Sequence, residues 1–512
     1  MLIAMTGVSG SMGSEALAQV MEQESVRTRV LLTPRKGNDK LEKELVKQYG
    51  ARIEILRGQV YDKKTCEKLV SGADMLVNMA AVIPPRSDKD PKASYLCNYK
   101  GAVCLADAAA NAAVQPKFIH ISTVAVYGNR TLEHPWGRPG DPLLPAVYDH
   151  YALHKMMAER YVMERGLKNF AVLRQSAMLY EGIIFKNIHD GLLFHTTLNG
   201  PLEWVSARDS GYLIRRIAER ELAGGNETFW NGVYDIAGGP QNRCTGYDTF
   251  ADGFSLMGGS PKKYFKPCHC ETRNFHGLWF ADGALEEMFG YQRDTVKGFW
   301  EEIGKKYKFF KAAKLVPSAL IRLFLFRRLL GDGNAPAKWI KKGDEGRVIA
   351  AFGGMEEALS LPRDWEDFAV ADAAQWGGRE ARPLENCKDK LLSHGYDESK
   401  RPSGWTIEDM RAAAAFRGGA CLSEKMGATP YDKLQWCCSE GHVFSASPYT
   451  VLKGGHWCPA CLSEGWNFDS LAQKSPFYAQ VWYDSHTRGE NMRYWFDEEG
   501  NARFEEVAKE RA

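Results

Sequence analysis

Tyr151 and Lys155 have the residue types and the spacing that acid–base chemistry at an alcohol or carbonyl group requires. They lie four residues apart in "YDHYALHK", so on a helix they face the same side. A nearby ammonium lowers the pKa of a phenol, which can then exchange a proton near neutral pH. Thr123 ends the apolar run "KFIHIST", and its hydroxyl could hold a substrate oxygen. These three residues predict proton transfer beside a bound substrate.

The glycines of "TGVSGSMG", residues 6–13, predict a site for a diphosphate. They follow "MLIAM", which is typical of a buried strand, and precede a helix expected over 14–20. Glycine permits a tight turn and a close approach of the backbone to a ligand, and the amides of a helix N-terminus attract phosphate oxygens. An ordinary surface turn is the alternative for this pattern taken alone.

The next expected strand, "RTRVLLTPRKG", ends in basic residues. An acidic residue at this strand end usually holds the free 2′-hydroxyl of an adenosine ribose, whereas a 2′-phosphate favours arginine or lysine. Arg35 and Lys36 occupy the position here, after Thr33 and without a carboxylate. The sequence therefore favours NADP over NAD, with NAD as the alternative.

The elements that would position these residues alternate between strands and helices. Strand-then-loop units recur at residues 58–62, 73–85 and 117–123, and helix-like segments such as "GAVCLADAAANAA" separate them. Such alternation predicts an α/β fold built on a doubly wound parallel sheet.

Taken in this order, the motifs resemble those of the extended short-chain dehydrogenase/reductase family, which is NAD(P)-dependent and epimerase/dehydratase-like, across about residues 1–310. The matching pieces are the glycine loop, "NMAA" (78–81), "NYKG" (98–101), the Ser/Thr of "ISTVAVYG" (121–128), the Tyr-x3-Lys pair and "VSARDSG" (205–211). The resemblance implies a Rossmann-type domain with a smaller substrate lobe, and it allows a homodimer.

The resemblance also implies roles for individual residues. Tyr151 would be the acid/base, Lys155 would bind the nicotinamide ribose and tune Tyr151, and Thr123 would orient the reacting oxygen. The expected cofactor-binding residues are Gly7, Ser9, Gly10, Met12, Gly13, Arg35, Lys36, Ala80, Ala81, Tyr151 and Lys155.

Two segments depart from the family pattern. Gln59 stands where an aspartate commonly contacts adenine, and "LRQSAMLYEG" (173–182) lacks the "NxYGP" pattern that sugar-nucleotide epimerases and dehydratases often show after the equivalent arginine, Arg174. Residues 181–205 and 276–292, expected in the substrate lobe, are rich in Phe, Leu, Ile and Trp. Pockets lined in this way suit apolar ligands, although the same residues would also serve as core.

The main interpretation is therefore an oxidoreductase that moves a hydride between NADP(H) and a carbonyl or alcohol carbon of an apolar small molecule. One alternative is a sugar-nucleotide epimerase or dehydratase that keeps its NAD(P) bound. The other is a cofactor-sensing scaffold that recruits a partner. The complete set of Thr123, Tyr151 and Lys155 argues against the scaffold, which would not need it.

A second constellation near the C-terminus predicts a structural zinc ion. Cys438-x3-His442 and Cys458-x2-Cys461 offer four nitrogen and sulfur ligands, which zinc binds tetrahedrally with no open position for catalysis. The surrounding pattern resembles zinc-ribbon or treble-clef modules over about residues 405–465. Cys437 and Cys421 remain alternative ligands, whereas Cys268 and Cys270 are interpreted as structural.

Charge argues against nucleic acid as a partner. The net formal charge is +2, and from residue 401 to 512 acidic residues outnumber basic ones by 15 to 12. A face that binds DNA usually carries a basic excess. A small-molecule substrate is the expected partner.

Residues 305–342, called here the basic segment, hold 11 Lys and Arg against the single acid Asp332. Their apolar core, "ALIRLFLFRRLL", needs a cover, and their charges need counter-charges. We expect the helix to dock on the body of the protein near the substrate lobe. Peripheral contact with an anionic membrane surface is the alternative.

The 512 residues predict an NAD(P)-binding and substrate domain at 1–310, a basic and apolar helical extension at 311–376, a connector at 377–404 and a zinc-ribbon-like domain at 405–512. Twelve cysteines without a leader at the N-terminus predict a reducing, cytoplasmic compartment. A membrane-spanning helix is not expected.

Overall fold

A seven-stranded sheet forms the centre of the first half of the chain. The structure, a computed structural model, describes residues 1–187, 189–270, 273–463, 465–498 and 501–507. The strand order is β10-β7-β5-β4-β1-β2-β3, and every neighbouring pair is parallel. The strands are β1 Leu2–Thr6, β2 Arg27–Leu32, β3 Ile53–Arg57, β4 Met75–Asn78, β5 Lys117–Thr123, β7 Phe170–Gln175 and β10 Gly232–Ile236. The predicted doubly wound fold is confirmed.

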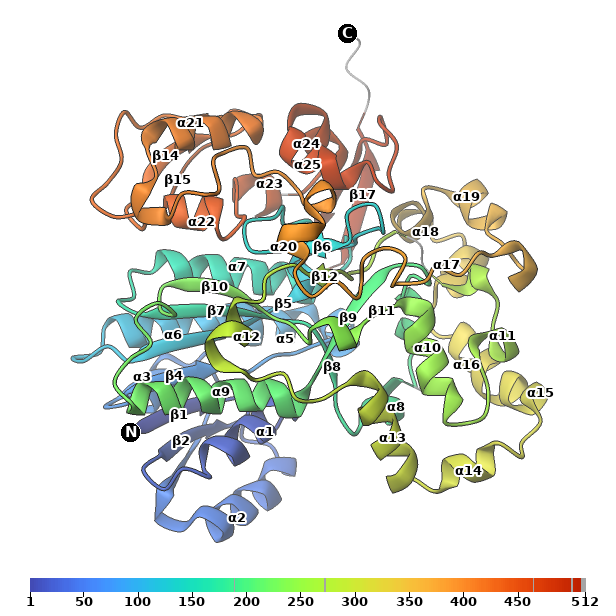
Figure 1. Cartoon of the computed structure of the whole chain (residues 1–512), viewed down its shortest axis with the longest axis horizontal. Helices are drawn as coiled ribbons and strands as arrows, with labels where there is room; N and C mark the ends of the chain where they lie inside the picture. Colours follow the sequence, from blue (N-terminus) through green and yellow to red (C-terminus); the bar gives the residue numbers. More distant parts are fainter. Residues whose placement is uncertain (188, 271–272, 464, 499–500, 508–512) are drawn as a thin grey trace.

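Helices cover both faces of this sheet, so its central strands β1 and β4 are buried almost from end to end (Figure 1). One face carries α1 Ser11–Val20 and α9 Ala207–Leu222. The other carries α3 Lys63–Val70, α6 Gly101–Ala110 and α7 His150–Glu164. The short α4 Arg86–Lys89, α5 Pro91–Ser94 and π-helical η2 Tyr95–Lys100 lead into α6, and α2 Gly37–Tyr49 follows β2. The strand order reverses between β1 and β4, and ligands of such sheets bind at this point.

A lobe of short strands and helices follows β7. Its sheet joins β8 Ala177–Leu179, β9 Pro201–Ser206 and β11 Arg243–Thr245. Its first helices are α8 Ile183–Asn187, the 3₁₀ turn η4 Gly191–His195, α10 Gly246–Ser255, α11 Pro261–Tyr264 and α13 Val296–Lys306, whereas α12 Ala284–Phe289 packs beside β10 and α9 of the central sheet. The basic segment continues it with α14 Phe309–Ala313, α15 Ser318–Ile321, π-helical η7 Arg322–Phe326, α16 Arg327–Leu330 and α17 Pro336–Lys342, after which come α18 Glu345–Phe352 and α19 Met355–Ser360.

The C-terminal part packs on the α7 side of the molecule (Figure 1). It holds the strands β13 Ala420–Cys421, β14 Leu434–Cys437 and β15 Val443–Ala446, the hairpin β16 Met492–Phe496 with β17 Ala502–Glu506, and the helices α21 Ile407–Phe416, α22 Pro448–Leu452, α23 Ala460–Ser463, α24 Phe468–Lys474 and α25 Pro476–Trp482. Trp436 and Trp457 belong to the same buried cluster as Leu153 and Met156 of α7. This part therefore shares a core with the helix of the Tyr151–Lys155 pair.

The remaining elements tie the parts together. The strands β6 Trp136–Gly137 and β12 Trp279–Phe280 pair with each other, and α20 Pro383–Asn386 lies in the stretch expected as a connector. In that stretch His394 is fully buried, with Nε2 2.8 Å from Asp141. Within the described residues, no helix combines the length and the apolar character needed to cross a membrane.

Candidate functional site

Thr123 and Tyr151 meet at the carboxyl edge of the central sheet. Thr123 is the last residue of β5, and Tyr151 lies in the first turn of α7. The helix begins after Asp149, whose carboxylate accepts a hydrogen bond from the Ala152 N–H at 2.9 Å and caps the helix. Both side chains line the same cavity, and the Thr123 hydroxyl is close enough to lower the pKa of Tyr151. The cap and the strand end thus bring the two predicted hydroxyl groups together.

Burial dominates the electrostatics of the pair. It raises the pKa of Tyr151 to about 12, against the hydrogen bond from Thr123, which lowers it. The Nζ of Lys155 donates to the Ile121 carbonyl at 2.6 Å. Burial lowers the pKa of Lys155 itself to about 8. That the Lys155 ammonium lowers the phenol pKa stays a prediction.

The glycine loop between β1 and α1 packs so closely against neighbouring backbone that Gly7 and Gly13 leave no space for a larger residue. Gly7 has a φ of +74°, and a Cβ added there would lie 2.5 Å from the Met79 carbonyl carbon. A Cβ on Gly13 would lie 2.2 Å from the Gly7 carbonyl oxygen. Gly10 precedes α1 without a side-chain cap, and the first turn has no acidic residue. The first amides of α1 are thus left for an anion, which fits the diphosphate of a dinucleotide.

Arg35 lies beside this loop. Its Nη2 donates to Ser9 Oγ at 3.2 Å, and its Nε lies 3.4 Å from Asn38 Oδ1. Lys36 precedes α2, and both cations are exposed. Two exposed cations next to a diphosphate cradle fit an extra phosphate on the ribose.

The loop after β4 completes the cradle on the other side of the switch point. The Thr6 hydroxyl donates to Asn78 Oδ1 at 2.7 Å and accepts from the N–H of Ala80 at 3.1 Å. This bond holds the ends of β1 and β4 together. Ala80, which is half-buried, and Ala81, which is exposed, lie in the loop just after β4, while Met12 is buried in α1. The predicted cofactor residues from both sides therefore lie along one edge of the sheet.

A cavity of about 350 Å³, the catalytic cavity, opens in front of Thr123 and Tyr151. Its other walls come from segments far apart in the sequence: Ile83, Pro84, Asp88, Val124, Ala146–Asp149, Gln175–Met178, Tyr180, Ile183, Leu192, His195, Asn274–His276, Asn334, Trp339 and Arg347. Among the described residues of this wall, Arg347 is the only Lys or Arg. Its guanidinium lies 5.2 Å from the Tyr148 ring centre and 5.3 Å from that of Trp339.

Gln175, His276, Asp149 and Arg347 were not predicted as site residues. The Oε1 of Gln175 and the Nδ1 of His276 are buried without a hydrogen-bond partner among the described residues. Burial raises the pKa of Asp149 to about 7 and lowers that of His276 to about 4. Only Asp149 had a signal in the sequence, as an N-cap residue ahead of the Tyr151 helix.

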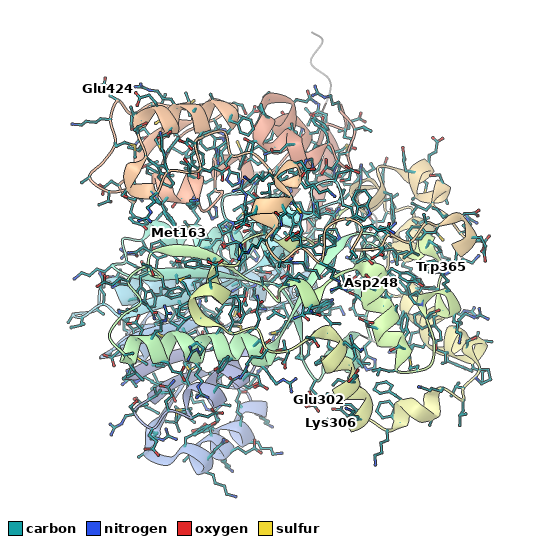
Figure 2. The ribbon with its side chains drawn as sticks, viewed as in Figure 1. Met163, Asp248, Glu302, Lys306, Trp365 and Glu424 are labelled. Carbon is teal, nitrogen blue, oxygen red and sulfur yellow. The ribbon has the colours of Figure 1, made fainter. Side chains whose placement is uncertain are left out.

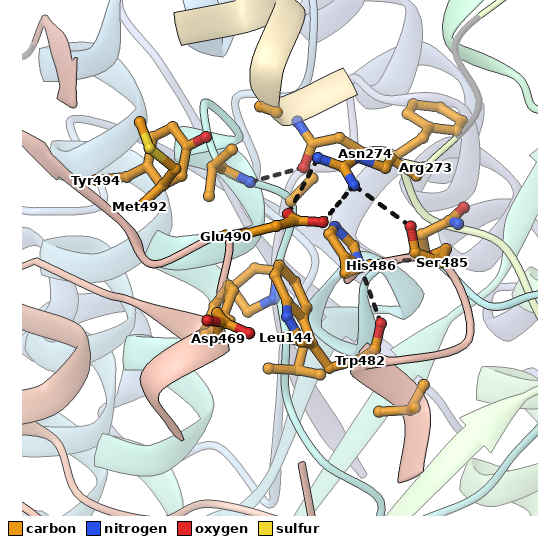
Figure 3. A pocket seen from close by; sticks show the side chains of 18 residues that line it. Leu144, Arg273, Asn274, Asp469, Trp482, Ser485, His486, Glu490, Met492 and Tyr494 are labelled. Carbon is orange, nitrogen blue, oxygen red and sulfur yellow. Dashed lines mark hydrogen bonds and ion pairs between the residues drawn. The ribbon is translucent and has the colours of Figure 1, made fainter. Parts of the chain in front are cut away.

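The segment at Asn274–His276 is held by the C-terminal part of the chain (Figure 3). Arg273 donates to both carboxylate oxygens of Glu490, at 2.8 and 3.1 Å, and to the Ser485 carbonyl at 3.4 Å. The Asn274 side chain accepts from the Val147 N–H at 3.1 Å. Residues near the end of the chain thus position one wall of the catalytic cavity.

Cys438, His442, Cys458 and Cys461 gather in the C-terminal part. Their ligand atoms all lie within 4.8 Å of one another. His442 Nδ1 lies 3.5, 3.6 and 3.4 Å from the sulfurs of Cys438, Cys458 and Cys461, and the Cys438 and Cys461 sulfurs are 3.7 Å apart. At usual zinc bond lengths a tetrahedron places S and N about 3.6 Å apart and two sulfurs about 3.8 Å apart. These separations fit a zinc ion.

The two alternative ligands are not part of this cluster in the described residues. The Cys437 thiol lies 3.6 Å from the Cys438 carbonyl oxygen, and Cys421 sits opposite Trp436 in the strand register.

Residues 3–176 match the family model described as the NAD dependent epimerase/dehydratase family. Among solved structures, a double mutant of dTDP-glucose 4,6-dehydratase from Streptomyces venezuelae, with NAD bound, is similar at 20% identity and a TM-score of 0.47, over 61% of this chain and 100% of the other. UDP-glucuronic acid 4-epimerase from Bacillus cereus, in complex with NAD, is similar at 19% identity and a TM-score of 0.44, over 60% and 98%.

Proposed function

We propose that the chain catalyses an NAD(P)-dependent reaction at a carbon that carries a hydroxyl or carbonyl oxygen, with Tyr151 as the acid/base. The observation that carries the proposal is the placement of Thr123 and Tyr151 in one cavity at the same sheet edge as the glycine loop. A nicotinamide bound there would accept or return a hydride. The protein's part is to place the substrate oxygen between two hydroxyl groups and to move its proton.

Each residue of the pair has a separate task in this scheme. When a substrate carbonyl is reduced, its carbon would receive the hydride of a bound nicotinamide and the Tyr151 hydroxyl would pass its proton to the oxygen; oxidation of an alcohol is the reverse and starts from the Tyr151 phenolate. Thr123 donates a hydrogen bond to the same substrate oxygen and fixes its direction. Lys155, held by the Ile121 carbonyl, places a cation one turn along α7 from Tyr151. In the resembled family this cation binds the nicotinamide ribose.

The family match favours a cofactor that stays bound over one that is consumed. It covers the glycine loop, Thr123, Tyr151 and Lys155 and is to a family of epimerases and dehydratases. We therefore place the epimerase or dehydratase type ahead of the net oxidoreductase that was the main interpretation of the sequence. In such a reaction the hydride removed in the first half is returned in the second.

Identifying the bound nucleotide and measuring whether added NAD(P) is consumed test this choice. The purified protein would be denatured and the released nucleotide identified, and the native protein would then be mixed with UDP- and dTDP-sugars and with hydroxylated lipids. We expect bound cofactor, a transient change in its absorbance on mixing with a substrate, and no net conversion of added NAD(P). Stoichiometric consumption of added cofactor would instead restore the net oxidoreductase.

We also propose that Cys438, His442, Cys458 and Cys461 hold a structural zinc ion. The interatomic separations and the absence of a fifth protein donor in the described cluster support this assignment. Four protein ligands leave no coordination position for substrate. The role of the ion would be to hold the C-terminal part of the chain against α7.

A further inference from the structure

A second cavity of about 390 Å³, the apolar cavity, adjoins the catalytic cavity. The two share five lining residues, namely Ala177, Ile183, Leu192, Phe275 and His276. A molecule whose reacting oxygen lies at Tyr151 could therefore extend past these residues into the apolar cavity. The two cavities together form one site: the catalytic cavity contains Tyr151, and the apolar cavity extends from it into the lobe.

The lining of the apolar cavity selects hydrocarbon. Most of its walls are aliphatic or aromatic, among them Leu202, Phe250, Phe254, Trp300 and Phe326. No Lys, Arg, Asp or Glu occurs among its described lining residues, and the Thr249 hydroxyl already accepts from Trp204 Nε1 at 3.0 Å. A nucleotide diphosphate would lose its hydration there without receiving ionic partners. An acyl or isoprenoid chain has no charged group to desolvate, so its burial is favourable.

A polar atom marks the boundary between the two compartments. His276 lines both cavities, and its Nδ1 has no hydrogen-bond partner among the described residues. Burial holds the pKa of His276 near 4, so the ring is neutral at physiological pH. The site thus matches an amphiphile whose polar head ends where its apolar tail begins.

The outer wall of the apolar cavity belongs to the basic segment. Phe309, Phe310, Leu325, Phe326 and Leu329 line it from α14, η7 and α16. The helical stretch 318–330 buries Phe326 and Leu329, each 2% exposed. The predicted docking on the body is therefore correct for this face of the helix, which covers the cavity.

The opposite face of the same stretch, together with Leu315 just before it, carries an exposed apolar strip, defined here as Leu315, Leu320, Leu323 and Phe324. Leu315 is 86% exposed and Phe324 72%, with Leu320 and Leu323 at 44% and 49%. Residues 320, 323 and 324 follow helical spacing, so they form one face. For this face the prediction of a cover from the protein body is wrong, because the helix lies at the edge of the lobe (Figure 1).

Unpaired cations surround the apolar strip. Arg322, Arg327 and Arg328 are exposed and have no ion-pair partner among the described residues. Lys306, by contrast, lies at the end of neighbouring α13 (Figure 2). Its Nζ is 2.7 Å from a carboxylate oxygen of Glu181. The three arginine charges are therefore available to an anionic surface. Leucine and phenylalanine flanked by arginine match the interfacial zone of an anionic bilayer.

We propose that the apolar strip and Arg322, Arg327 and Arg328 bind an anionic membrane surface, and that the enzyme takes from it a lipid whose tail fills the apolar cavity while its hydroxyl or carbonyl head reaches Tyr151. The choice of head chemistry rests on the proposed function. The membrane contact and the tail site rest on the lining, the exposure and the charge alone.

Vesicle flotation tests the membrane contact. Wild-type protein should float with vesicles of phosphatidylcholine and phosphatidylserine at low salt, bind phosphatidylcholine alone at least tenfold less, and be released by high salt. The triple variant Arg322→Glu, Arg327→Glu, Arg328→Glu should lose this binding about tenfold or more. Lys43→Glu, Lys47→Glu, Lys64→Glu changes the same charge at exposed positions on α2 and α3 and should bind as wild type.

The double variant Leu323→Ser, Phe324→Ser tests whether loss of vesicle binding could come from misfolding. It leaves every charge in place and changes only exposed side chains. It should weaken vesicle binding while the thermal melting curve stays unchanged. Failure of the wild type to float, or equal flotation by the arginine triple variant, would overturn the membrane proposal. An acidic protein partner would give that same negative result with vesicles.

A cavity-filling variant tests the tail site without relying on catalysis. A Cβ added at Gly253 would lie 3.9 Å from the Trp300 ring, so Gly253→Leu fits the backbone and occupies the apolar cavity. It should reduce binding of a fluorescent long-chain fatty alcohol about tenfold or more. Ser255→Leu adds the same side chain at an exposed position of the same helix and should bind the probe as wild type.

Tyr151→Phe separates this inference from the proposed function. It should bind vesicles and the fluorescent alcohol as wild type does, because the hydroxyl lies outside the apolar cavity. Probe binding that Gly253→Leu leaves unchanged overturns the tail site, whatever Tyr151→Phe does to turnover. Full turnover by Tyr151→Phe, with probe binding lost in Gly253→Leu, overturns only the proposed function.

Discussion

The Nε2 atom of His456 lies 2.9 Å from Oε1 of Glu159, one helical turn beyond Lys155. Both side chains are buried, and Glu159 also accepts from Arg174 at 2.6 Å and from Ser122 at 2.6 Å. His456 is two residues before Cys458 in the chain. The cysteine and histidine cluster and α7 are therefore neighbours through one buried carboxylate, and the C-terminal part is packed into the rest of the fold.

Metal removal should affect both halves of the molecule. Cys458→Ser or Cys461→Ser is expected to lose zinc and to lower the melting temperature of the whole chain, because the binding energy of a structural ion is folding energy and this module shares a core with α7. Elemental analysis and calorimetry measure both effects. Cys437→Ser, next to the cluster but outside it, should keep the zinc. Wild-type protein purified without chelator and found free of zinc would remove the assignment.

The 2′-phosphate should matter to cofactor affinity. Because Arg35 sits beside the glycine loop, NADPH should bind more tightly than NADH by about 1–3 kcal/mol, the range for charge-assisted bonds. Arg35→Ala with Lys36→Ala should remove most of this difference, while Lys43→Ala on the outside of α2 should not. Calorimetric titration with both nucleotides gives the comparison. Equal affinities for the wild type would contradict the prediction.

Tyr151→Phe should separate binding from chemistry. The variant keeps the ring but loses the proton donor, so cofactor affinity should stay nearly constant and turnover should fall by about 10²–10⁴-fold. Thr123→Val, which removes the hydroxyl that bonds Tyr151, should also lower turnover. Single-turnover kinetics on the true substrate provide the measurement. Wild-type rates from Tyr151→Phe would exclude this residue from proton transfer.

The carboxyl group of Asp149 should make stability depend on pH. Burial raises its pKa to about 7, whereas an aspartate in an unfolded chain titrates near ~3.9. A raised pKa means that the contribution to stability is complete at low pH and is lost as the pH rises through 7. Asp149→Asn still offers an N-cap acceptor but cannot ionise. It should therefore be more stable than wild type at pH 8, by up to about 4 kcal/mol, and not at pH 4.

Urea unfolding at pH 4, 6 and 8 measures this difference. The exposed N-cap residue Asp62, which accepts from the Thr65 N–H at 2.8 Å, is the control. Its pKa is lowered by that hydrogen-bonded turn, so Asp62→Asn should bring no gain at pH 8. A stability difference between wild type and Asp149→Asn that does not change with pH would refute the assigned pKa.

The fold class was predictable because its signals are local. A buried strand, three glycines and a helix occupy the first 20 residues, and the Tyr151–Lys155 spacing needs only one helix. The Cys458–Cys461 spacing likewise needs only one turn. The predicted roles of the individual site residues remain predictions, since their geometry shows proximity and not chemistry.

The rest of the site depends on contacts between distant segments. Arg347 reaches the catalytic cavity from α18, nearly 200 residues after Tyr151, and no local pattern distinguishes it from other helical arginines. The two faces of the 318–330 stretch have similar apolar residues, so only the three-dimensional arrangement separates Phe326 from Phe324. The same holds for Lys155, whose bond to Ile121 follows from how α7 crosses the end of β5.

The stacking of Phe496 on His150, with ring centres 3.7 Å apart, has a consequence for biosynthesis. During translation the glycine loop, the central sheet and Tyr151 are synthesised early, and N-terminal units generally fold first. The residues that lie against the start of α7 and hold the Asn274–His276 wall emerge only with the last part of the polypeptide. An incomplete chain would then carry every expected catalytic residue and still lack the finished site, so a premature stop late in translation would yield a molecule without activity.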